Sequence, residues 1–148
     1  ALNEMPDFDG DGDVDADDFD ILGTYRDSTD RHYDLTHDGV MDSGDVAYMI
    51  SDCLQWSRGD LNGWGTFAGD LNLDGVIDLI DLGTIGEAYG VGLGLACGDA
   101  NGDGVVDLID LGLVGENYGQ DAASVPEPTS MVLMAMAGAT LLRRRRQA

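Results

Sequence analysis

The sequence predicts a mainly α-helical fold, built from four short loop-helix units that are arranged as two pairs. Two observations indicate this. Residues 69–90 and 98–119 are identical at 16 of 22 aligned positions, and weaker copies of their first halves lie at residues 7–18 and 34–45. After each of the two strong copies, apolar residues recur at the spacing of an amphipathic helix. A segment repeated in this way indicates one structural unit used several times.

The repeats divide the chain into two regions and two connections. We expect the first pair of units in residues 1–56 and the second pair in residues 69–119. A Gly- and Trp-bearing connection, residues 57–68, joins the pairs, and a further linker covers residues 120–129. A C-terminal tail at 125–148 is expected to carry a short hydrophobic helix.

The composition narrows the classes of protein. The chain has 29 Asp and Glu against 7 Lys and Arg, a formal net charge of -22, which argues against a nucleic-acid partner. Its 22 glycines favour short elements and tight loops over one large core. With two Cys and two His in all, a zinc site is not expected. Because the chain begins at Ala1 without a Met, we expect a fragment or a processed chain.

All four copies share one register of oxygen-bearing residues. Asp stands at positions 1, 5, 9 and 12, an Asp, Asn or Thr at position 3, Gly at position 6 and an apolar residue at position 8. Calcium takes about six to eight oxygen ligands, and a twelve-residue EF-hand loop supplies them from this spacing, with position 7 giving its backbone carbonyl. The register therefore predicts EF-hand-like calcium loops, two in the second pair and up to four in all.

The predicted ligands are side-chain oxygens, with backbone carbonyls at position 7. The first pair contributes Asp7, Asp9, Asp11, Asp13, Asp15, Asp18, Asp34, Thr36, Asp38, Val40, Asp42 and Asp45. The second pair contributes Asp70, Asn72, Asp74, Val76, Asp78, Asp81, Asp99, Asn101, Asp103, Val105, Asp107 and Asp110. Position 12 is Asp where EF-hands usually have Glu, so the following helix must lie closer to the ion. The apolar position-8 residues are expected to meet in a short strand pairing within each pair.

The helices after the strong loops have apolar stripes and internal glycines. The stripes are Leu79, Leu82, Ile85 or Gly86 and Tyr89 in one helix, and Leu108, Leu111, Val114 and Tyr118 in the other. Gly90 and Gly119 are predicted to end the helices. The internal glycines each cost about 1 kcal/mol relative to Ala. They are expected to permit close backbone approach, either between the two helices or with a partner; they are Gly83, Gly86, Gly112 and Gly115.

Residues 69–119 resemble a type I dockerin, a tandem of two calcium loop-helix units with Asp at position 12 and often Asn at position 3. Here Asn72 and Asn101 occupy position 3. The resemblance implies a non-catalytic docking module that binds a cohesin-like partner and is associated with polysaccharide degradation. Many dockerins carry a small hydroxyl pair at positions 10 and 11, and basic residues in the helix middle. This chain has Leu79-Ile80 and Leu108-Ile109 at positions 10 and 11, and Glu87 and Glu116 in the helix middle.

These differences from the dockerin pattern change the kind of partner that we expect. We expect Leu79, Ile80, Leu108 and Ile109 to form the partner-binding surface, with one residue of each adjacent pair in the core and the other exposed. The partner should then be more apolar or more basic than a usual cohesin. The alternative is a calcium-stabilised structural spacer between an upstream domain and a surface anchor.

The tail resembles a PEP-CTERM sorting signal. It has Pro126, Glu127 and Pro128, then an apolar run at 131–142, then Arg143, Arg144, Arg145 and Arg146. The run is shorter than the roughly 20 residues of a stable membrane span. The resemblance implies recognition by an exosortase, a transient inner-membrane contact through the run, and sorting to the surface of a Gram-negative-type bacterium.

Other residues leave alternatives open. Cys53 and Cys97 form either a disulfide or two free buried thiols, and Trp56, Trp64 and Phe67 either pack between modules or stack on sugar rings. His32 and His37 are expected to be exposed, and no nucleophile accompanies them. Carboxylates committed to calcium are poor general acids, because the cation lowers their pKa. We therefore do not expect the chain itself to be an enzyme.

Overall fold

The computed structural model describes residues 5–91 and 94–124. Its elements are α1 (Ala16–Thr24), α2 (Ser43–Tyr48), the π-helical turn η1 (Met49–Cys53), β1 (Gln55–Arg58), β2 (Leu61–Trp64), α3 (Leu79–Ala88), the 3₁₀ turn η2 (Leu95–Cys97), α4 (Leu108–Asn117) and the 3₁₀ turn η3 (Ala122–Ser124). The predicted C-terminal helix and the sorting residues lie outside the described residues, as does the apolar run at 131–142.

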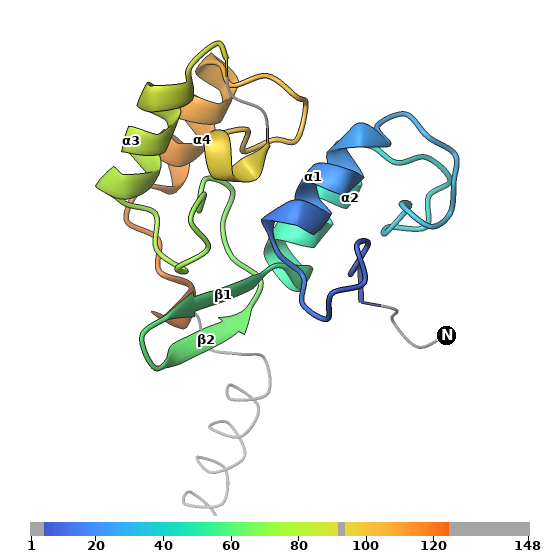
Figure 1. The fold of residues 1–148 in the computed structure, drawn as a ribbon, viewed down its shortest axis with the longest axis horizontal. Coiled ribbons are helices and arrows are strands. Elements are labelled where there is room, and N and C mark those ends of the chain that lie inside the picture. Colours follow the sequence, from blue (N-terminus) through green and yellow to red (C-terminus); the bar gives the residue numbers. More distant parts are fainter. Residues whose placement is uncertain (1–4, 92–93, 125–148) are drawn as a thin grey trace, which may run out of the picture.

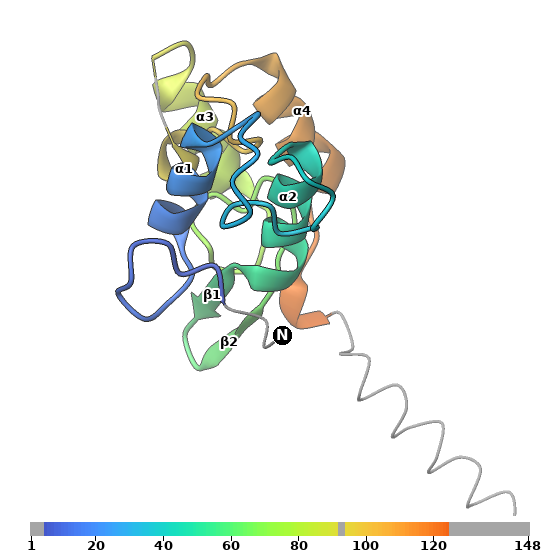
Figure 2. The same cartoon turned by 90° about the vertical axis from the view of Figure 1, so that its right-hand side faces the viewer.

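The helices form two pairs, with a hairpin beside them. Helices α3 and α4 lie together on one side and α1 and α2 on the other, while β1 and β2 extend below the junction (Figure 1). Turning the molecule shows that α1 faces the α3 side and that η3 lies next to the hairpin (Figure 2). Each of the four α-helices begins at position 10 of one of the twelve-residue segments that the sequence singles out.

Within the second pair, each loop is tied to the segment that follows the partner helix. The N–H of Ile77 donates to the carbonyl of Gln120 (3.1 Å), and its carbonyl accepts from the N–H of Gly119 (2.9 Å). The carbonyl of Val106 accepts from the N–H of Gly90 (2.9 Å). The expectation that the two position-8 residues meet each other is therefore wrong, because their backbone groups are used by the chain beyond the opposite helix.

The first pair repeats this exchange. The N–H of Met41 donates to the carbonyl of Ser28 (2.8 Å), and its carbonyl accepts from Asp27 (2.9 Å), just past α1. The carbonyl of Val14 accepts from the N–H of Gln55 (2.8 Å), just past η1. The position-8 side chains are fully buried in all four units: Val14, Met41, Ile77 and Val106. Each pair therefore holds together by reciprocal backbone bonds around buried apolar residues.

The connection between the pairs is a structured hairpin that begins at Gln55, inside the predicted first pair. Strands β1 and β2 pair antiparallel, and Gly59 at the turn has a φ of 61°, which suits a tight hairpin turn. Trp56 is buried under the hairpin, and a Cβ at Gly75 would come within 2.5 Å of its ring. Trp56 and the partly buried Phe67 thus pack between modules, whereas Trp64 is 55% exposed.

The two pairs share one hydrophobic core, because buried residues of both belong to one continuous cluster. Polar contacts add to it. The Arg26 guanidinium after α1 donates to the carbonyl of Asn101 (2.9 Å), and Asp20 of α1 accepts from the N–H of Leu95 (2.7 Å). The ion pair between Arg58 and Asp121 (3.2 Å) ties the hairpin to the segment after α4.

Three expectations about side chains can be compared with the structure. Of the two alternatives for the cysteines, free thiols are observed, but only Cys53, at the end of η1, is buried, while Cys97, at the end of η2, is exposed. Burial raises the pKa of the Cys53 thiol to about 11. In α3 the buried residues are Asp81 and Ile85, while Leu79 is 69% exposed, so the predicted apolar stripe is rotated. Both histidines are exposed, as predicted.

Candidate metal centres

The carboxylate at position 12 forms the centre of each loop. In the third loop, Asp81 accepts from the N–H of Leu71 through one oxygen (2.8 Å) and from the N–H of Asp78 through the other (2.9 Å). In the fourth loop, Asp110 does the same with Ala100 and Asp107, both at 2.8 Å. All four position-12 carboxylates are fully buried: Asp18, Asp45, Asp81 and Asp110. Because each α-helix begins two residues before this aspartate, its short side chain reaches the backbone N–H groups of its own loop.

The same residues begin the helices. Position 9 is the N-cap of every α-helix, and position 12 completes a reciprocal capping box with it. In α3, for example, Asp78 accepts from the N–H of Ile80 (2.7 Å). Capping satisfies backbone donors that a helix start leaves unpaired. The aspartates at positions 9 and 12 therefore have a structural role that does not depend on any ion.

The carboxylate at position 1 closes the loop from the opposite side. Asp70 accepts from the N–H groups of Asp74 (3.2 Å) and Gly75 (3.0 Å). The position-6 glycines all have positive φ, which lets the chain turn sharply beneath this carboxylate: Gly12, Gly39, Gly75 and Gly104. The backbone N–H groups point inward at carboxylate oxygens, so the loops are wrapped around their acidic side chains.

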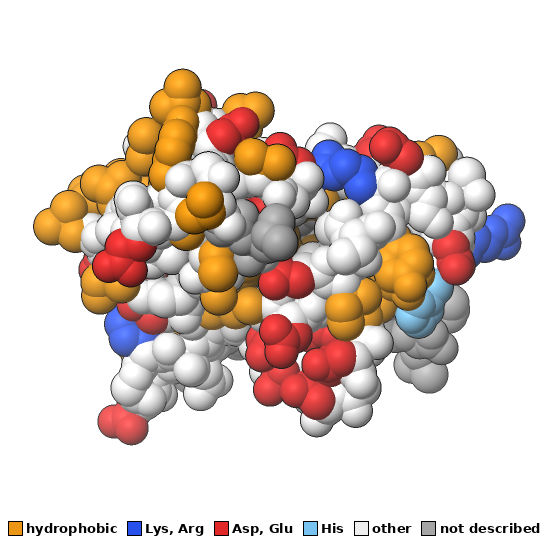
Figure 3. Space-filling view, turned by 45° about the horizontal axis from the view of Figure 1, so that its top comes forward, with side chains coloured by type: hydrophobic (Ala, Val, Ile, Leu, Met, Phe, Trp, Pro, Cys, Tyr) orange, Lys and Arg blue, Asp and Glu red, His pale blue; other side chains and the backbone are white. Residues whose placement is uncertain are grey.

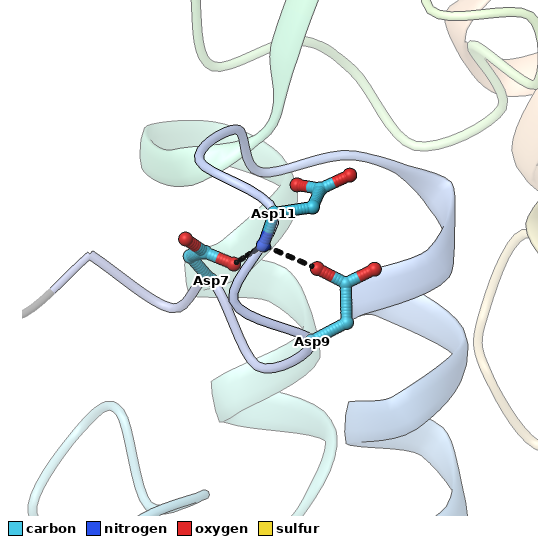
Figure 4. Close-up of side chains that lie close together, drawn as sticks. All are labelled: Asp7, Asp9 and Asp11. Atoms are coloured by element: carbon cyan, nitrogen blue, oxygen red, sulfur yellow. Dashed lines mark hydrogen bonds between the residues drawn. The ribbon is translucent and has the colours of Figure 1, made fainter.

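In the first loop, three carboxylates come close enough to share an ion. Oxygens of Asp7, Asp9 and Asp11 lie within 4.8 Å of one another. Figure 4 shows them around the backbone N–H of Asp11, which donates to Asp7 (3.1 Å) and Asp9 (3.0 Å). A second group of this kind joins Asp13 and Asp15 to Asp18. Such groups repel one another unless a cation or a proton lies between them.

Position 3 distinguishes the second loop from the others. Asp9, Asn72 and Asn101 each accept from the N–H of position 5, at 3.0, 3.0 and 2.8 Å. In the second loop the N–H of Asp38 donates only to Asp34 (3.0 Å), and Thr36 contributes its N–H, which donates to Asp45 (2.9 Å). The Thr36 hydroxyl therefore takes no share in the hydrogen bonds described for this loop.

Burial changes the acidity of several of these groups. Burial raises the pKa of Asp70 to about 6, although a hydrogen bond from the Thr66 hydroxyl acts in the opposite direction. Burial likewise raises the pKa of Asp81 and of Asp99. These carboxylates are held out of water next to other acids, so the negative form is costly without a compensating cation.

The remaining predicted ligands make hydrogen bonds within their own loops. At position 7 the N–H groups donate to the position-5 carboxylates, from Asp13, Val40, Val76 and Val105. Asp99 and Asp103 of the fourth loop repeat the contacts of Asp70 and Asp74, with Asp99 accepting from Asp103 (3.1 Å). Asp42 and Asp15 cap α2 and α1. Sequence reasoning did not identify Thr66 as a partner of the third loop, since its hydroxyl gives no periodic signal.

Two exposed apolar pairs lie in the second pair of units, at the starts of α3 and α4. Leu79 and Leu108 are each 69% exposed, and Ile80 and Ile109 are each 59% exposed. The expectation that one of each adjacent pair is in the core is therefore wrong; the capping aspartates point inward and both apolar neighbours point outward. Hydrophobic side chains gather on the α3 side of the molecule (Figure 3). We call Leu79, Ile80, Leu108 and Ile109 the outer apolar face.

The glycines inside α3 and α4 lie on the exposed side of the helices. No atom outside the local backbone lies within 4 Å of a Cβ built at any of the four, Gly83, Gly86, Gly112 and Gly115. Close approach between the two helices is therefore not the reason for these glycines. The alternative, an approach from outside the described chain, stays a prediction.

A family model for the PEP-CTERM protein-sorting motif matches residues 124–146. This motif marks an exported, surface-sorted protein that is anchored at the membrane by its C-terminus and is recognised by an exosortase. No dockerin or EF-hand family is matched. No curated protein and no solved structure matches the chain. Among the described residues, none of the helices combines the length and apolar character that a bilayer crossing requires.

Proposed function

We propose that the chain is a non-catalytic, calcium-binding docking module of an exported, surface-sorted protein. The observation that carries the proposal is the common geometry of the four loops. In each, the N–H of the position-6 glycine donates to the position-1 carboxylate, and the position-12 carboxylate is fully buried at the start of the helix. This leaves carboxylate, amide and carbonyl oxygens as the groups available to a hard cation such as calcium.

The net charge supports the same conclusion. The chain carries -22, and buried acids such as Asp70, Asp81 and Asp99 have raised pKa values. Four divalent ions would remove about eight of these negative charges and the local repulsion with them. Each site should add about 2.7 kcal/mol of stability when calcium is at 100 Kd. Calcium would therefore stabilise the fold as well as fill the loops.

We infer a docking role from the outer apolar face. Exposed residues of this size are costly in water unless a partner covers them. Because α3 and α4 are near-identical in sequence, a partner could dock in either of two orientations related by the repeat. A cohesin-like domain with an apolar or basic surface suits Leu and Ile beside the acidic loops. The association with polysaccharide degradation rests on the dockerin resemblance alone.

A structural spacer remains the second candidate, because the structure joins the two pairs through one core and through the Arg26–Asn101 contact. A rigid body of this kind would separate an upstream domain from the C-terminal anchor without any protein partner. The outer apolar face distinguishes the two candidates, since a spacer has no use for it.

Calcium binding is tested by calorimetric titration of the metal-free chain, with helicity followed by circular dichroism. We expect uptake of at least two ions, and loss of helicity in excess chelator that calcium reverses. The double variant Asp81→Asn with Asp110→Asn should lose the sites of the second pair. The control is Asp60→Asn, which removes an exposed acid in the hairpin turn. Unchanged helicity in chelator together with no heat of binding would refute the calcium proposal.

Docking is tested by capture of proteins secreted by the source organism, in calcium, on the immobilised chain. Retention of a protein by the wild type that is lost in Leu79→Asp with Leu108→Asp supports docking. Because both side chains are 69% exposed, these changes should leave the fold intact. If nothing is retained by either form, the spacer is favoured.

A further inference from the structure

A cavity of about 490 Å³ lies between the two pairs, away from the outer apolar face. Val46 and Ile50 line it from the first pair, Phe67 from the connection, and Leu113 from α4. This volume is in the range of small-molecule sites, which are mostly apolar with a few placed polar groups. The cavity exists only because the two pairs pack against each other, so neither pair forms it alone.

Arg26 is the cation of this cavity. Arg26 lines the wall, and its guanidinium donates through Nη2 to the carbonyl of Asn101 (2.9 Å). Its Nε is buried and has no hydrogen-bond partner. Among residues 5–91 and 94–124, the ion pair between a basic and an acidic side chain is that of Arg58 with Asp121, so Arg26 has no carboxylate partner there. A buried donor without a partner costs free energy and calls for an explanation.

The absence of a partner is notable given the composition. The chain offers 29 Asp and Glu, and a guanidinium is readily paired by a carboxylate in bidentate fashion. Arg26 instead binds a neutral carbonyl, and it lines the cavity without a carboxylate partner among the described residues. Charge complementarity therefore favours an anionic occupant, while the apolar walls favour a hydrophobic body.

We propose that the cavity between the two pairs binds a small apolar molecule bearing one anionic group, with Arg26 as the charge partner. The inference rests on the proposed function in one respect. Asp103, a predicted ligand of the fourth loop, also lines the cavity, and its negative charge opposes an anion until a calcium ion neutralises it. Binding of the anion should therefore be tighter with calcium than in chelator.

The test uses two fluorescent probes with the full chain in calcium. Anilinonaphthalene sulfonate is apolar with one negative charge, and phenylnaphthylamine is its uncharged analogue. We expect the sulfonate to bind one-to-one and Arg26→Gln to weaken it at least about tenfold, as for loss of a charge-assisted hydrogen bond. The analogue should bind wild type and Arg26→Gln equally. Arg31→Gln is the matched control, because it removes the same charge from an exposed position.

A second variant guards against a folding defect in Arg26→Gln. Ala47 lines the cavity but is exposed, so Ala47→Trp should fill the cavity without disturbing the core and should weaken both probes. Equal sulfonate affinity in wild type, Arg26→Gln and Ala47→Trp would overturn the proposal. So would loss of binding in Leu79→Asp with Leu108→Asp, which would place the probe on the outer apolar face.

Calcium uptake, measured separately by calorimetry, keeps the two proposals distinguishable. If no calcium binds but the sulfonate still depends on Arg26, the metal proposal fails and the anion site stands. If calcium binds normally and the affinity for the sulfonate is unchanged in Arg26→Gln and Ala47→Trp, the anion site fails and the metal proposal stands.

Discussion

The hydroxyl of Thr66 donates a 2.5 Å hydrogen bond to Oδ2 of Asp70, and both side chains are buried. Thr66 belongs to the connection and Asp70 opens the third loop, so the connection helps to hold that loop in place. The N–H of Thr66 also donates to the carbonyl of Ile50 (2.8 Å), at the end of the first pair. One residue therefore links the first pair to a candidate metal ligand of the second.

The first prediction removes this hydroxyl. Thr66→Val keeps the shape of the side chain but leaves the buried Asp70 carboxylate with one donor fewer. We expect a loss of about 1–3 kcal/mol in the free energy of unfolding at neutral pH without metal. Urea denaturation in chelator measures it. Thr66→Ser, which keeps the hydroxyl, is the control, and a Val variant as stable as the Ser variant would contradict the prediction.

The second prediction concerns pH in the metal-free chain. Burial raises the pKa of Asp70 to about 6, whereas an unfolded Asp has a pKa of about 3.9. The folded chain therefore binds more protons than the unfolded chain between these values, and stability falls as pH rises through the window. We expect a lower urea midpoint at pH 7 than near pH 4.5 in chelator, as far as Asp70 contributes.

The variant Asp70→Asn isolates that contribution, because it cannot titrate and its profile should be flatter. With saturating calcium the direction should reverse, since protons compete with the metal for the same carboxylate. A metal-free profile that is identical in wild type and Asp70→Asn would show that this group does not carry the pH dependence.

The start of each helix could be predicted from the sequence because the signals are local. Aspartates at positions 9 and 12 of one loop cap one helix, and the glycine at position 6 turns the same short segment. Gly90 and Gly119 follow α3 and α4 with positive φ, as predicted from their place after the apolar pattern. The geometry of the loops thus follows from residues a few positions apart.

What could not be predicted depends on contacts between distant segments. Ile77 forms backbone hydrogen bonds with Gly119 and Gln120. No sequence motif links these positions to Ile77, whereas the spacing of the repeats predicts that the two loops pair with each other. The sequence does not predict that Leu79 and Ile80 are both exposed. Helical periodicity gives the spacing of the apolar residues but does not show which side of the first turn faces the core. The sequence predicts a connection at 57–68 and does not indicate the hairpin of residues 55–64, since its strands are only four residues each.

The third prediction uses the open glycines of α3 and α4. Gly83→Ala with Gly112→Ala should raise the free energy of unfolding by about 1 kcal/mol for each helix, because Ala favours the helix and no atom lies within 4 Å of the new Cβ. Thermal denaturation measures the gain. If a partner's backbone approaches these positions, the same variant should lose captured protein while it gains stability.

A glycine in a different setting gives the contrast. A Cβ at Gly69 would come within 2.9 Å of the Cα of Val114, and the φ of Gly69 is 108°. Gly69→Ala should therefore destabilise the chain. Similar effects of Gly69→Ala and of the double variant in α3 and α4 would show that the packing around these glycines differs from that described.

The fourth prediction concerns the loop with the poorest ligand at position 3. Thr36→Asp gives the second loop the side chain that Asp9 supplies to the first, so it adds a charged ligand beside Asp34 and Asp38. Because ligand charge is one determinant of calcium affinity in such loops, we expect this loop to bind calcium about tenfold more tightly, or about 1.4 kcal/mol. Without metal the added carboxylate should lower stability, since it repels its neighbours.

The Gly39 amide, which donates to Asp34 (2.9 Å), reports on this loop in an NMR titration. Thr36→Asn supplies an oxygen without the charge and should fall between the two, whereas a Gly39 amide that titrates at the same calcium concentration in all three forms would exclude position 3 as a ligand.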